Sequence, residues 1–402
     1  MLPQGLTFAE RFDGISGSAI RDIFKVLARP NMISFAGGNP AADALPDVEC
    51  AELAREALLA DGKRILQYGA TEGYPPFLES LTGYLQEQFA PYQSVMGPVE
   101  KTQVLPLSGS TQGMDILCKA FINPGDAILV ESPTFLGNMQ SLRIYQSQLI
   151  PVESDDGGLI LEKLEQAVQK HKPKMLYTIP TFQNPSGQTL AADRREPIAR
   201  MAEKYGFLVI EDDPYRDLRY AGEPLAPIKA YDRQGYVAYM GSFSKLISPG
   251  LRVGYLLAQE DILRKCIIGK QSTDLHTASL TQAMVDLYLR RGMLRPHIDE
   301  ILPPYREKMN LMLSELEKFP AGIQYTRPEG GLFIFVTMPE GFNATEAFAE
   351  AVERGVAYVP GTHFYPDGGH HNTLRLNFSN STPQQIVKGM DILRTLFEEK
   401  LA

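Results

Sequence analysis

Two apolar runs joined by a polar turn, YVAYMGSFSKLISPGLRVGYLLA (residues 236–258), indicate the fold class of this chain. Each run is short and continuously apolar, which is typical of strands that are buried on both faces of a parallel sheet. Four further runs of this kind precede them, separated by longer helical patterns: TQVLPLS, DAILVES, KMLYTIP and GFLVIEDD. Strands that alternate with helices predict an α/β fold, with a mostly parallel central sheet between layers of helices.

The length of the chain and the patterns after residue 290 predict two domains. A chain of 402 residues suits two packed domains. Residues 46–290 contain the alternating pattern and are predicted to form the large domain. Residues 291–402 contain an amphipathic stretch, PPYREKMNLMLSELEKF, and then the strand patterns GGLFIFVTM, VAYVPG and TLRLNFS, which predict a smaller α+β domain. Residues 1–45 are predicted to be an N-terminal arm and helix that pack with the small domain.

Charge and composition exclude several classes of protein. A net charge of -9 argues against the phosphate backbone of a nucleic acid as the main partner. Cys50, Cys118 and Cys266 are far apart and lack a C-x-x-C spacing, so we expect neither a disulfide framework nor a zinc site. No apolar stretch approaches the ~20 residues of a membrane helix, and no signal-peptide pattern begins the chain. We therefore expect a cytoplasmic protein without a bound metal or a membrane contact.

Polar residues follow the predicted strands at the edge where open α/β sheets bind their ligands. GSTQG (residues 109–113) opens a helix whose free N–H groups suit an anion, although an ordinary capped helix start has the same pattern. Asn184 in TFQNPSG and Asp212 in EDDPY follow two other runs. A turn would explain the first and a helix cap the second, so neither motif by itself defines a site.

The turn after the run at 236–242 contains a lysine and an arginine seven residues apart. Partial burial at the end of a strand lowers the pKa of Lys245 and makes its amine a nucleophile for a carbonyl compound. Arg252 offers a planar fork to a phosphate, and Ser242 and Ser244 add hydroxyl donors. A small molecule that carries both a phosphate and a carbonyl group would use all four residues.

Four motifs in one order, GSTQG, TFQNPSG, EDDPY and SFSKLISPGLRVGY, resemble those of the fold-type I aminotransferases (class I/II) that depend on pyridoxal 5'-phosphate (PLP). Within this family the chain is similar to the branch of 2-aminoadipate, kynurenine and aromatic aminotransferases, from about residue 15 to the C-terminus. The resemblance implies amino acid and 2-oxo acid substrates and a homodimer with shared active sites. One such motif is a weak signal, whereas four in register are specific.

The resemblance implies roles for the residues that match these motifs. Lys245 would form the Schiff base with the cofactor and move the proton at the substrate Cα. Asp212 would keep the pyridine nitrogen protonated, which strengthens the ring as an electron acceptor. Tyr215 and Asn184 would donate to the phenolic O3′. The phosphate cup would consist of Ser110, Thr111, Ser242, Ser244 and Arg252.

Further matches concern the ring face, the neighbouring subunit and the substrate. Phe135 would stack on the pyridine ring, and Tyr68 would reach the phosphate of the neighbouring subunit. Arg375 in TLRLNFS would grip the substrate α-carboxylate, together with Asn184 and a backbone contact at Gly38. The resemblance also suggests that the peptide bonds before Pro133 and Pro185 are cis.

Three positions leave details open. Close relatives often have glutamine at the position of Thr111, and many have tyrosine at the position of Phe135, so the finer hydrogen bonding is not defined. Arg21, in the first predicted helix, matches an arginine that meets a distal substrate carboxylate, but it would equally suit the wet face of that helix.

Other activities remain possible on this scaffold, because a fold does not determine a reaction. A C–S lyase would release pyruvate and ammonia. A PLP-sensing transcription regulator would carry a DNA-binding domain ahead of residue 15, and we expect no room for one. A dinucleotide-binding protein would need a G-x-G-x-x-G motif. We expect ping-pong transfer between an amino acid (2-aminoadipate, glutamate, aromatic or branched-chain) and a 2-oxo acid such as 2-oxoglutarate.

Overall fold

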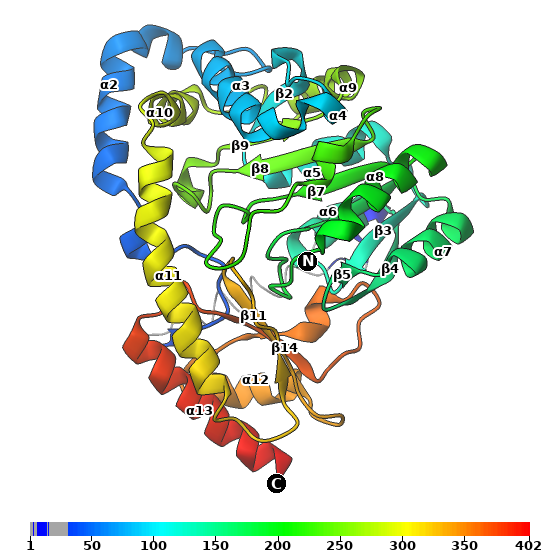
Figure 1. Cartoon of the computed structure of the whole chain (residues 1–402), viewed down its shortest axis with the longest axis vertical. Helices are drawn as coiled ribbons and strands as arrows, with labels where there is room; N and C mark the ends of the chain where they lie inside the picture. Colours follow the sequence, from blue (N-terminus) through cyan, green and yellow to red (C-terminus); the bar gives the residue numbers. More distant parts are fainter. Residues whose placement is uncertain (1–2, 4–5, 14, 16–30) are drawn as a thin grey trace.

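The structure, a computed structural model, describes residues 3, 6–13, 15 and 31–402. Its main sheet has eight strands in the order β2, β9, β8, β7, β6, β3, β4, β5 (Figure 1). Their bounds are β2 (Val104–Leu107), β3 (Ala127–Ser132), β4 (Gln148–Asp155), β5 (Gly158–Leu159), β6 (Met175–Thr178), β7 (Leu208–Asp212), β8 (Val237–Ser242) and β9 (Gly254–Leu257). The predicted α/β class with a large central sheet is confirmed.

Most neighbouring strands of this sheet are parallel, as predicted. β3 pairs in parallel with β4 and with β6, and the parallel series continues through β7 and β8. β9 and β2 form an antiparallel edge beside β8, and β5 is antiparallel to β4 at the opposite edge. The sequence did not predict β4, because its pattern QLIPVESD contains a proline and three charged or amide residues near the sheet edge. Of its eight residues only Val152 is buried.

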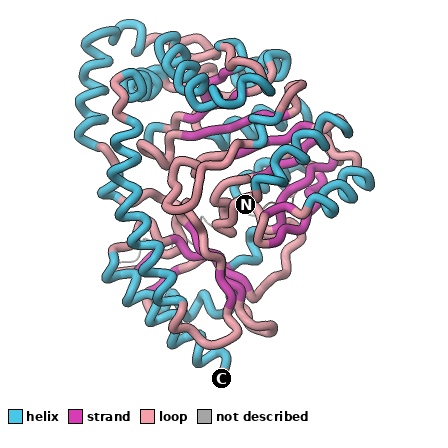
Figure 2. Tube along the Cα trace, in the orientation of Figure 1, coloured by secondary structure: helices cyan, strands magenta, loops and turns pink. Residues whose placement is uncertain are grey.

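Helices cover both faces of the main sheet (Figure 2). Consecutive strand residues point to opposite faces, so Leu129 packs in one core with α7 (Leu161–His171) and α8 (Ala192–Tyr205), while Ile128 packs in the larger core with α5 (Ser110–Phe121). The other helices of this part are α2 (Asp47–Ile65), α3 (Pro75–Phe89), α4 (Gln93–Met96), α6 (Leu136–Ile144), α9 (Glu260–Gln271) and α10 (Ser279–Arg290).

The C-terminal part is built on a four-stranded antiparallel sheet in the order β10, β11, β14, β13. α11 (Leu294–Leu316) runs from the main part to this sheet (Figure 1). The remaining elements here are β10 (Gln324–Tyr325), β11 (Phe333–Thr337), α12 (Ala344–Glu353), β12 (Val356–Ala357), β13 (Val359–Pro360), β14 (Thr373–Asn377) and α13 (Pro383–Leu401).

The segment before residue 45 joins the C-terminal part through a short strand. β1 (Ile33–Ser34) pairs in parallel with β12, and the carbonyl of Phe35 accepts a hydrogen bond from the amide of Asn377 at 2.8 Å. The predicted N-terminal helix and Arg21 lie outside the described residues. The domain boundaries at residues 45 and 290 remain predictions.

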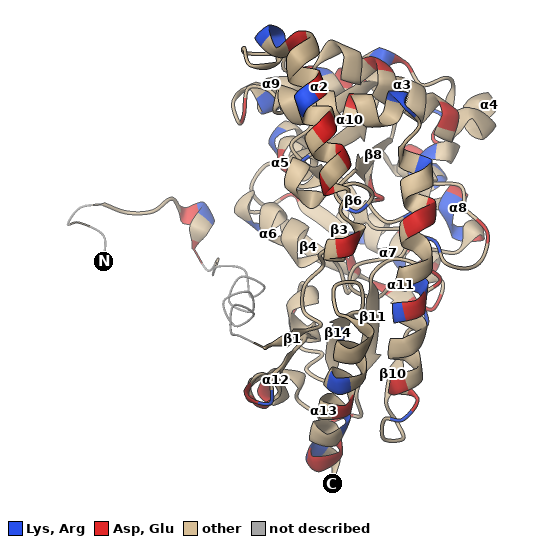
Figure 3. Ribbon diagram, turned by 90° about the vertical axis from the view of Figure 1, so that its left-hand side faces the viewer, with Lys and Arg blue, Asp and Glu red and all other residues tan. Residues whose placement is uncertain are grey.

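One hydrophobic core includes buried side chains of both parts, from Leu105 in β2 to Leu376 in β14. Full burial of a leucine side chain contributes roughly 1.5–3 kcal/mol, so this shared core holds the main sheet and the small sheet against each other. Charged residues of both signs are scattered over the outer helices α2, α8 and α11, whereas the strands are largely uncharged (Figure 3). Within the described part of the chain, no helix has the length and apolarity needed to cross a membrane.

Candidate active site

Four parallel strands end at one edge of the main sheet, and the loops after them carry most of the predicted site residues. β3, β6, β7 and β8 are consecutive neighbours by parallel pairing, so their carboxyl ends lie side by side. The peptide bonds Ser132-Pro133 and Asn184-Pro185, in the loops after β3 and β6, are both cis. The site residues at this edge are Phe135, Asn184, Asp212, Tyr215, Ser242, Ser244 and Lys245.

Asp212, the last residue of β7, is a buried carboxylate with one oxygen free. Its Oδ2 accepts hydrogen bonds from the Tyr177 hydroxyl at 2.9 Å and from Nδ2 of Asn138 at 3.2 Å. Its Oδ1 is buried without a hydrogen-bond partner. Burial is the largest cause that raises the pKa of Asp212, to about 7. A buried cationic donor beside Oδ1 would satisfy the oxygen and return the carboxyl to its charged form.

Lys245 lies three residues beyond the end of β8, with its amine in the site. Nζ donates to the carbonyl oxygen of Gly38 at 2.7 Å. Burial, aided by the nearby cations Arg375 and Arg252, lowers the pKa of this amine from 10.5 to about 8. In the described residues no carboxylate forms an ion pair with Lys245, so a neutral, nucleophilic amine is accessible near physiological pH.

Arg375, in the middle of β14, brings a buried positive charge from the small sheet to the site. Its Nη1 donates to Oδ1 of Asn184 at 2.7 Å and its Nη2 to the carbonyl of Ala36 at 2.6 Å, while Nε has no partner. Its guanidinium lies over the ring of Phe333 at 4.3 Å from the centroid. Burial lowers the pKa of Arg375 to about 10. No carboxylate among the described residues pairs with it, and such an unpaired buried cation is a site for an anion.

Tyr215 adds a buried hydroxyl to the same edge of the sheet. Its ring packs edge-on against Phe333, with centroids 5.9 Å apart. Burial raises the pKa of its hydroxyl, and the cation of Arg375 partly opposes that rise. The hydroxyl therefore remains protonated near neutral pH and can donate a hydrogen bond to a ligand oxygen.

An anion cradle forms where α5 begins. Gly109, with φ +81°, precedes Ser110, and a Cβ added to Gly109 would lie 2.1 Å from Nη2 of Arg252. Ser242 at the end of β8 pairs in register with Gly254, and a Cβ added to Gly254 would lie 3.0 Å from the amide nitrogen of Ser110. These close approaches bring the helix N-terminus, the guanidinium and the strand-end hydroxyl together, which is the donor set that a phosphate prefers.

The other predicted members of the cradle differ in exposure. Ser244 is buried and its amide donates to Oγ of Ser242 at 3.1 Å, whereas Thr111 is exposed in the first turn of α5. Phe135 is half-buried directly before α6, against Gly137. Tyr68 stands apart from these residues: it is 81% exposed, and its ring packs edge-on against His276 at 6.4 Å.

The sequence interpretation missed Asn138 and Tyr177, which hold Asp212. Both side chains are buried, and Nδ2 of Asn138 also donates to the Tyr177 hydroxyl at 2.8 Å. A signal for Asn138 existed, since it is a polar residue among Leu136, Met139 and Leu142 on the buried side of α6. Tyr177 gave no signal, because an aromatic residue inside a strand pattern usually belongs to the core.

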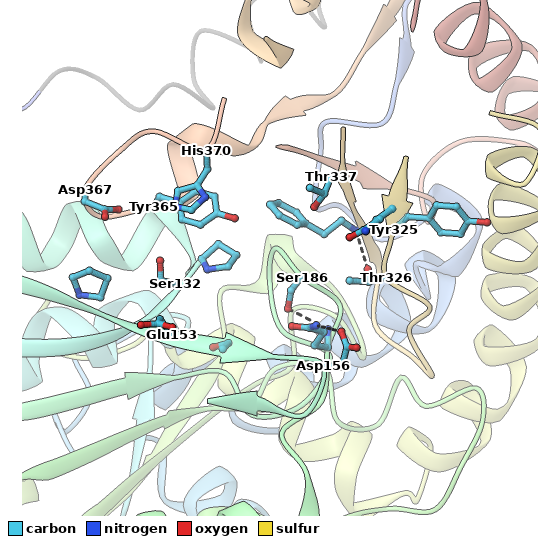
Figure 4. A pocket seen from close by; sticks show the side chains of 16 residues that line it. Ser132, Glu153, Asp156, Ser186, Tyr325, Thr326, Thr337, Tyr365, Asp367 and His370 are labelled. Atoms are coloured by element: carbon cyan, nitrogen blue, oxygen red, sulfur yellow. Dashed lines mark hydrogen bonds between the residues drawn. The ribbon is translucent and has the colours of Figure 1, made fainter. Parts of the chain in front are cut away.

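A cavity of about 650 Å³ adjoins this site between the main sheet and the small sheet (Figure 4). Its lining includes Ser132 and Ser186, which neighbour site residues in sequence, and Tyr325 from β10. His370 stacks on Tyr365 on the opposite wall, with ring centroids 3.8 Å apart. None of the predicted site residues that the structure describes lines this cavity, so the cavity borders the site without containing its predicted polar groups. No cluster of potential metal ligands occurs among the residues that the structure describes.

Comparisons with known proteins agree with this geometry. Residues 30–393 match the family model for aminotransferase class I and II. Aromatic-amino-acid aminotransferase 1 of Thermococcus litoralis is 38% identical over 400 residues, which cover 98% of this chain and 94% of that protein.

Two solved structures match almost the whole chain. The kynurenine aminotransferase of Pyrococcus horikoshii has a TM-score of 0.93 and 37% identity, with 98% of each chain covered. The alpha-aminoadipate aminotransferase of Thermus thermophilus, complexed with N-(5'-phosphopyridoxyl)-L-leucine, has a TM-score of 0.90 and 34% identity, with 98% of each chain covered. The chain therefore belongs to the class I and II aminotransferases, the fold-type I enzymes that transfer amino groups with pyridoxal phosphate.

Proposed function

We propose that this enzyme moves the α-amino group of 2-aminoadipate, glutamate, aromatic or branched-chain amino acids to a 2-oxo acid such as 2-oxoglutarate. The names of the relatives support this range, since they mention aromatic amino acids, kynurenine and alpha-aminoadipate, and one structure contains a phosphopyridoxyl-leucine. One observation carries the proposal. Lys245 and Arg375 donate to carbonyls two residues apart, those of Gly38 and Ala36, which suits the reacting centre and the α-carboxylate of an amino acid.

The residues present fit PLP. The unpartnered Oδ1 of Asp212 suits a protonated ring nitrogen, and the cradle at the start of α5 suits a phosphate. Asn184 and Tyr215 supply donors for the phenolic oxygen, and Phe135 supplies an aromatic face for the ring. We propose that the phosphate is held by Ser110, Thr111, Ser242, Ser244 and Arg252.

Lys245 performs the proton transfers in this proposal. Bound PLP supplies an electron sink for the negative charge that develops at the substrate Cα. With a pKa of about 8, the amine of Lys245 is neutral in part near pH 7 and can take the Cα proton. The ammonium so formed would return the proton to the cofactor carbon that is joined to Cα through the amino nitrogen. A negative Asp212 beside the ring nitrogen would keep that nitrogen protonated and so strengthen the electron sink.

Arg375 fixes the substrate relative to that base. A carboxylate on its guanidinium would accept from the unpartnered Nε and would offset the burial that now lowers the pKa of Arg375 to about 10. Because Asn184 and Ala36 hold the other two nitrogens, the fork has one orientation and the substrate Cα one position. Such positioning contributes to the rate without any further chemistry.

We also propose that the enzyme is a cytoplasmic homodimer with shared active sites. Tyr68 is 81% exposed, as suits a side chain that reaches into a second subunit. Cys118 and Cys266 are buried free thiols and Cys50 is a half-buried one, as suits a reducing compartment.

Arg21 is proposed to meet the distal carboxylate of substrates such as glutamate and 2-aminoadipate. Arg21→Met would then lower the preference for glutamate over leucine, measured as the ratio of the two kcat/KM values. An unchanged ratio would instead support a place for Arg21 on the exposed face of the predicted helix.

The test of the proposed function is a single half-reaction. The PLP-loaded enzyme is mixed with one amino acid at a time from a panel of 2-aminoadipate, glutamate, kynurenine, phenylalanine and leucine, without an oxo acid. We expect the visible band of the lysine-bound cofactor to disappear, one oxo acid to form per site, and 2-oxoglutarate to restore the band. Release of ammonia without loss of the band would instead support a lyase.

A matched variant locates the carboxylate site. Arg375→Lys keeps the charge but loses the bidentate fork. We expect its kcat/KM to fall at least ~10-fold for every amino acid, since loss of one hydrogen bond to a charged group costs about 1.5–3 kcal/mol. An unchanged kcat/KM would place the α-carboxylate elsewhere.

A further inference from the structure

A fully buried lysine lies next to the turn that begins α5. The side chain of Lys270, near the end of α9, has 0% of its surface exposed. Its ammonium donates to the two carboxylate oxygens of Asp274 at 2.9 and 2.8 Å, to Oε1 of Gln112 at 2.9 Å and to Oγ1 of Thr277 at 2.9 Å. Lysine is almost never buried so completely without partners. The reaction described above does not use this cluster.

The cluster holds the residue that precedes the anion cradle. Oγ of Ser108 donates to Asp274 at 2.6 Å, and the amide of Ser108 donates to the same Gln112 oxygen that Lys270 contacts, at 2.8 Å. The carbonyl of Ser108 accepts from Nη2 of Arg252 at 3.2 Å. All three polar groups of Ser108 are therefore fixed, two of them by partners of Lys270 and one by the guanidinium of the cradle.

The cluster also reaches the loop that carries Tyr68. The carbonyl of Thr277 contacts Nδ1 of His276 at 2.9 Å, and the amide of Gly69 donates to Nε2 of the same ring at 3.0 Å. These two contacts agree with one tautomer, in which Nδ1 carries the proton. Thr277 thus connects Lys270 on one side to the Tyr68 loop on the other.

We propose that Lys270 is a positioning residue for the cofactor phosphate, which fixes Ser108 and through it the first turn of α5 and the guanidinium of Arg252. The inference rests on the proposed function, because it assumes that the phosphate lies in this cradle. Lys270 and Asp274 form a neutral pair, so their contribution is orientation of the donors rather than attraction of the anion. Donors that are held in place before binding lose less entropy when the ligand arrives.

The test compares two aldehydes that differ only in the phosphate. Wild-type and Lys270→Met apoproteins are titrated with PLP and with pyridoxal, and the dissociation constant of each is read from the visible band of the Schiff base. We expect Lys270→Met to weaken PLP binding about tenfold, because Gln112 and Asp274 lose a hydrogen bond to a charged donor. The charge that this change leaves unpaired on Asp274 acts in the same direction, so Ser108→Ala, which changes no charge, separates orientation from repulsion. Binding of pyridoxal should change less than about twofold, because pyridoxal has no phosphate and so forms no hydrogen bonds with the cradle.

Lys229→Met is the matched control for the loss of a buried lysine. Lys229 is 7% exposed and donates to Asp232 at 2.7 Å and to the carbonyl of Val237 at 2.9 Å. Its loss should lower the melting temperature without changing the ratio of the PLP and pyridoxal constants. An equal change of that ratio in Lys229→Met would overturn the inference.

Ser108→Ala keeps the test informative if Lys270→Met does not fold. This variant removes only the hydroxyl that donates to Asp274. We expect the dissociation constant of PLP to rise about threefold relative to that of pyridoxal, as for the loss of one hydrogen bond. An unchanged ratio in both folded variants would refute the positioning role. If the wild-type protein itself forms no Schiff base with PLP, the proposed function fails; if it does and the variants match it, only the inference fails.

Discussion

At the scale of single residues, two unpartnered buried atoms at the site suit a ligand. Oδ1 of Asp212 and Nε of Arg375 are both buried and unpartnered, and a bound group that hydrogen-bonds to them would recover the free energy that their burial costs. Lys229 shows the ordinary case, since it is buried but paired with Asp232. All three side chains are buried, and they differ in whether every polar atom has a hydrogen-bond partner.

The pKa of Lys245 gives the first prediction. Below pH 8 most of its amine is protonated and cannot attack an aldehyde, and above pH 8 most is neutral. The rate at which the apoprotein forms a Schiff base with PLP should therefore rise with pH to a plateau, with a midpoint near 8 instead of 10.5. Stopped-flow absorbance from pH 6 to 10 measures it, and a midpoint near 10 would show that burial does not act on this amine.

Asp212→Asn is the second prediction. The amide cannot keep a positive charge on the ring nitrogen, so we expect kcat to fall at least ~100-fold, as for the loss of one preorganised electrostatic group. Tyr177→Phe is the control, because it removes only one hydrogen bond to Asp212 and should lower kcat by about tenfold or less. Equal effects of the two changes on steady-state kcat would contradict the role of the charge.

At the scale of elements, the turn from β2 into α5 determines whether an anion cradle exists. Residue 109 requires glycine for two reasons. Its φ is positive, and Nη2 of Arg252 lies only 2.1 Å from the position that a Cβ would occupy. The helix begins directly after this turn, so the same residue sets the direction of its N-terminus toward the site.

Gly109→Ala is the third prediction. It should weaken PLP binding, whereas a change with the same backbone strain elsewhere in the chain should not. Gly97 provides the control, because it has φ +78° and ψ 172°, close to the φ +81° and ψ 157° of Gly109, and no atom lies within 4 Å of its added Cβ. Both variants should lose about 1–3 kcal/mol of unfolding free energy through strain. Only Gly109→Ala should raise the dissociation constant of PLP relative to pyridoxal.

At the scale of the whole molecule, the proposed site takes its groups from both parts of the chain and, under the same proposal, from a second copy. The shared core holds Arg375 in β14 against the loops of the main sheet. Two large apolar side chains in the segment before Tyr68 are exposed, Leu66 at 77% and Leu59 at 72%. An exposed apolar group of this kind suits a surface that a second subunit covers.

Shared sites give the fourth prediction, by complementation. Tyr68→Ala and Lys245→Ala should each have little activity alone. A mixture of equal amounts, unfolded and refolded together, should regain about a quarter of the wild-type activity, because half of the dimers are mixed and each has one intact site. A mixture as inactive as its components would show that Tyr68 acts in its own subunit or not at all.

The sequence alone determined the fold class and the family and predicted most residues of the candidate site, since these depend on local patterns. Continuous apolar runs predicted the strands, and SFSKLISPGLR, TFQNPSG and EDDPY each place polar residues directly after a strand. Because parallel strands end at one edge, the order of these motifs was enough to bring Asn184, Asp212 and Lys245 together. The polar strand β4, next to the edge strand β5, was missed, because only Val152 of its eight residues is buried.

Only the tertiary structure decided which contacts complete the site. Tyr177 and Asn138 lie 35 and 74 residues from Asp212 in sequence, and Lys270 lies 158 residues from Gln112. Nothing local distinguishes Tyr177 from a core residue or Lys270 from a surface lysine on α9. Their roles follow from burial and from the polar atoms to which they donate, and these are properties of the packed chain and not of any short segment.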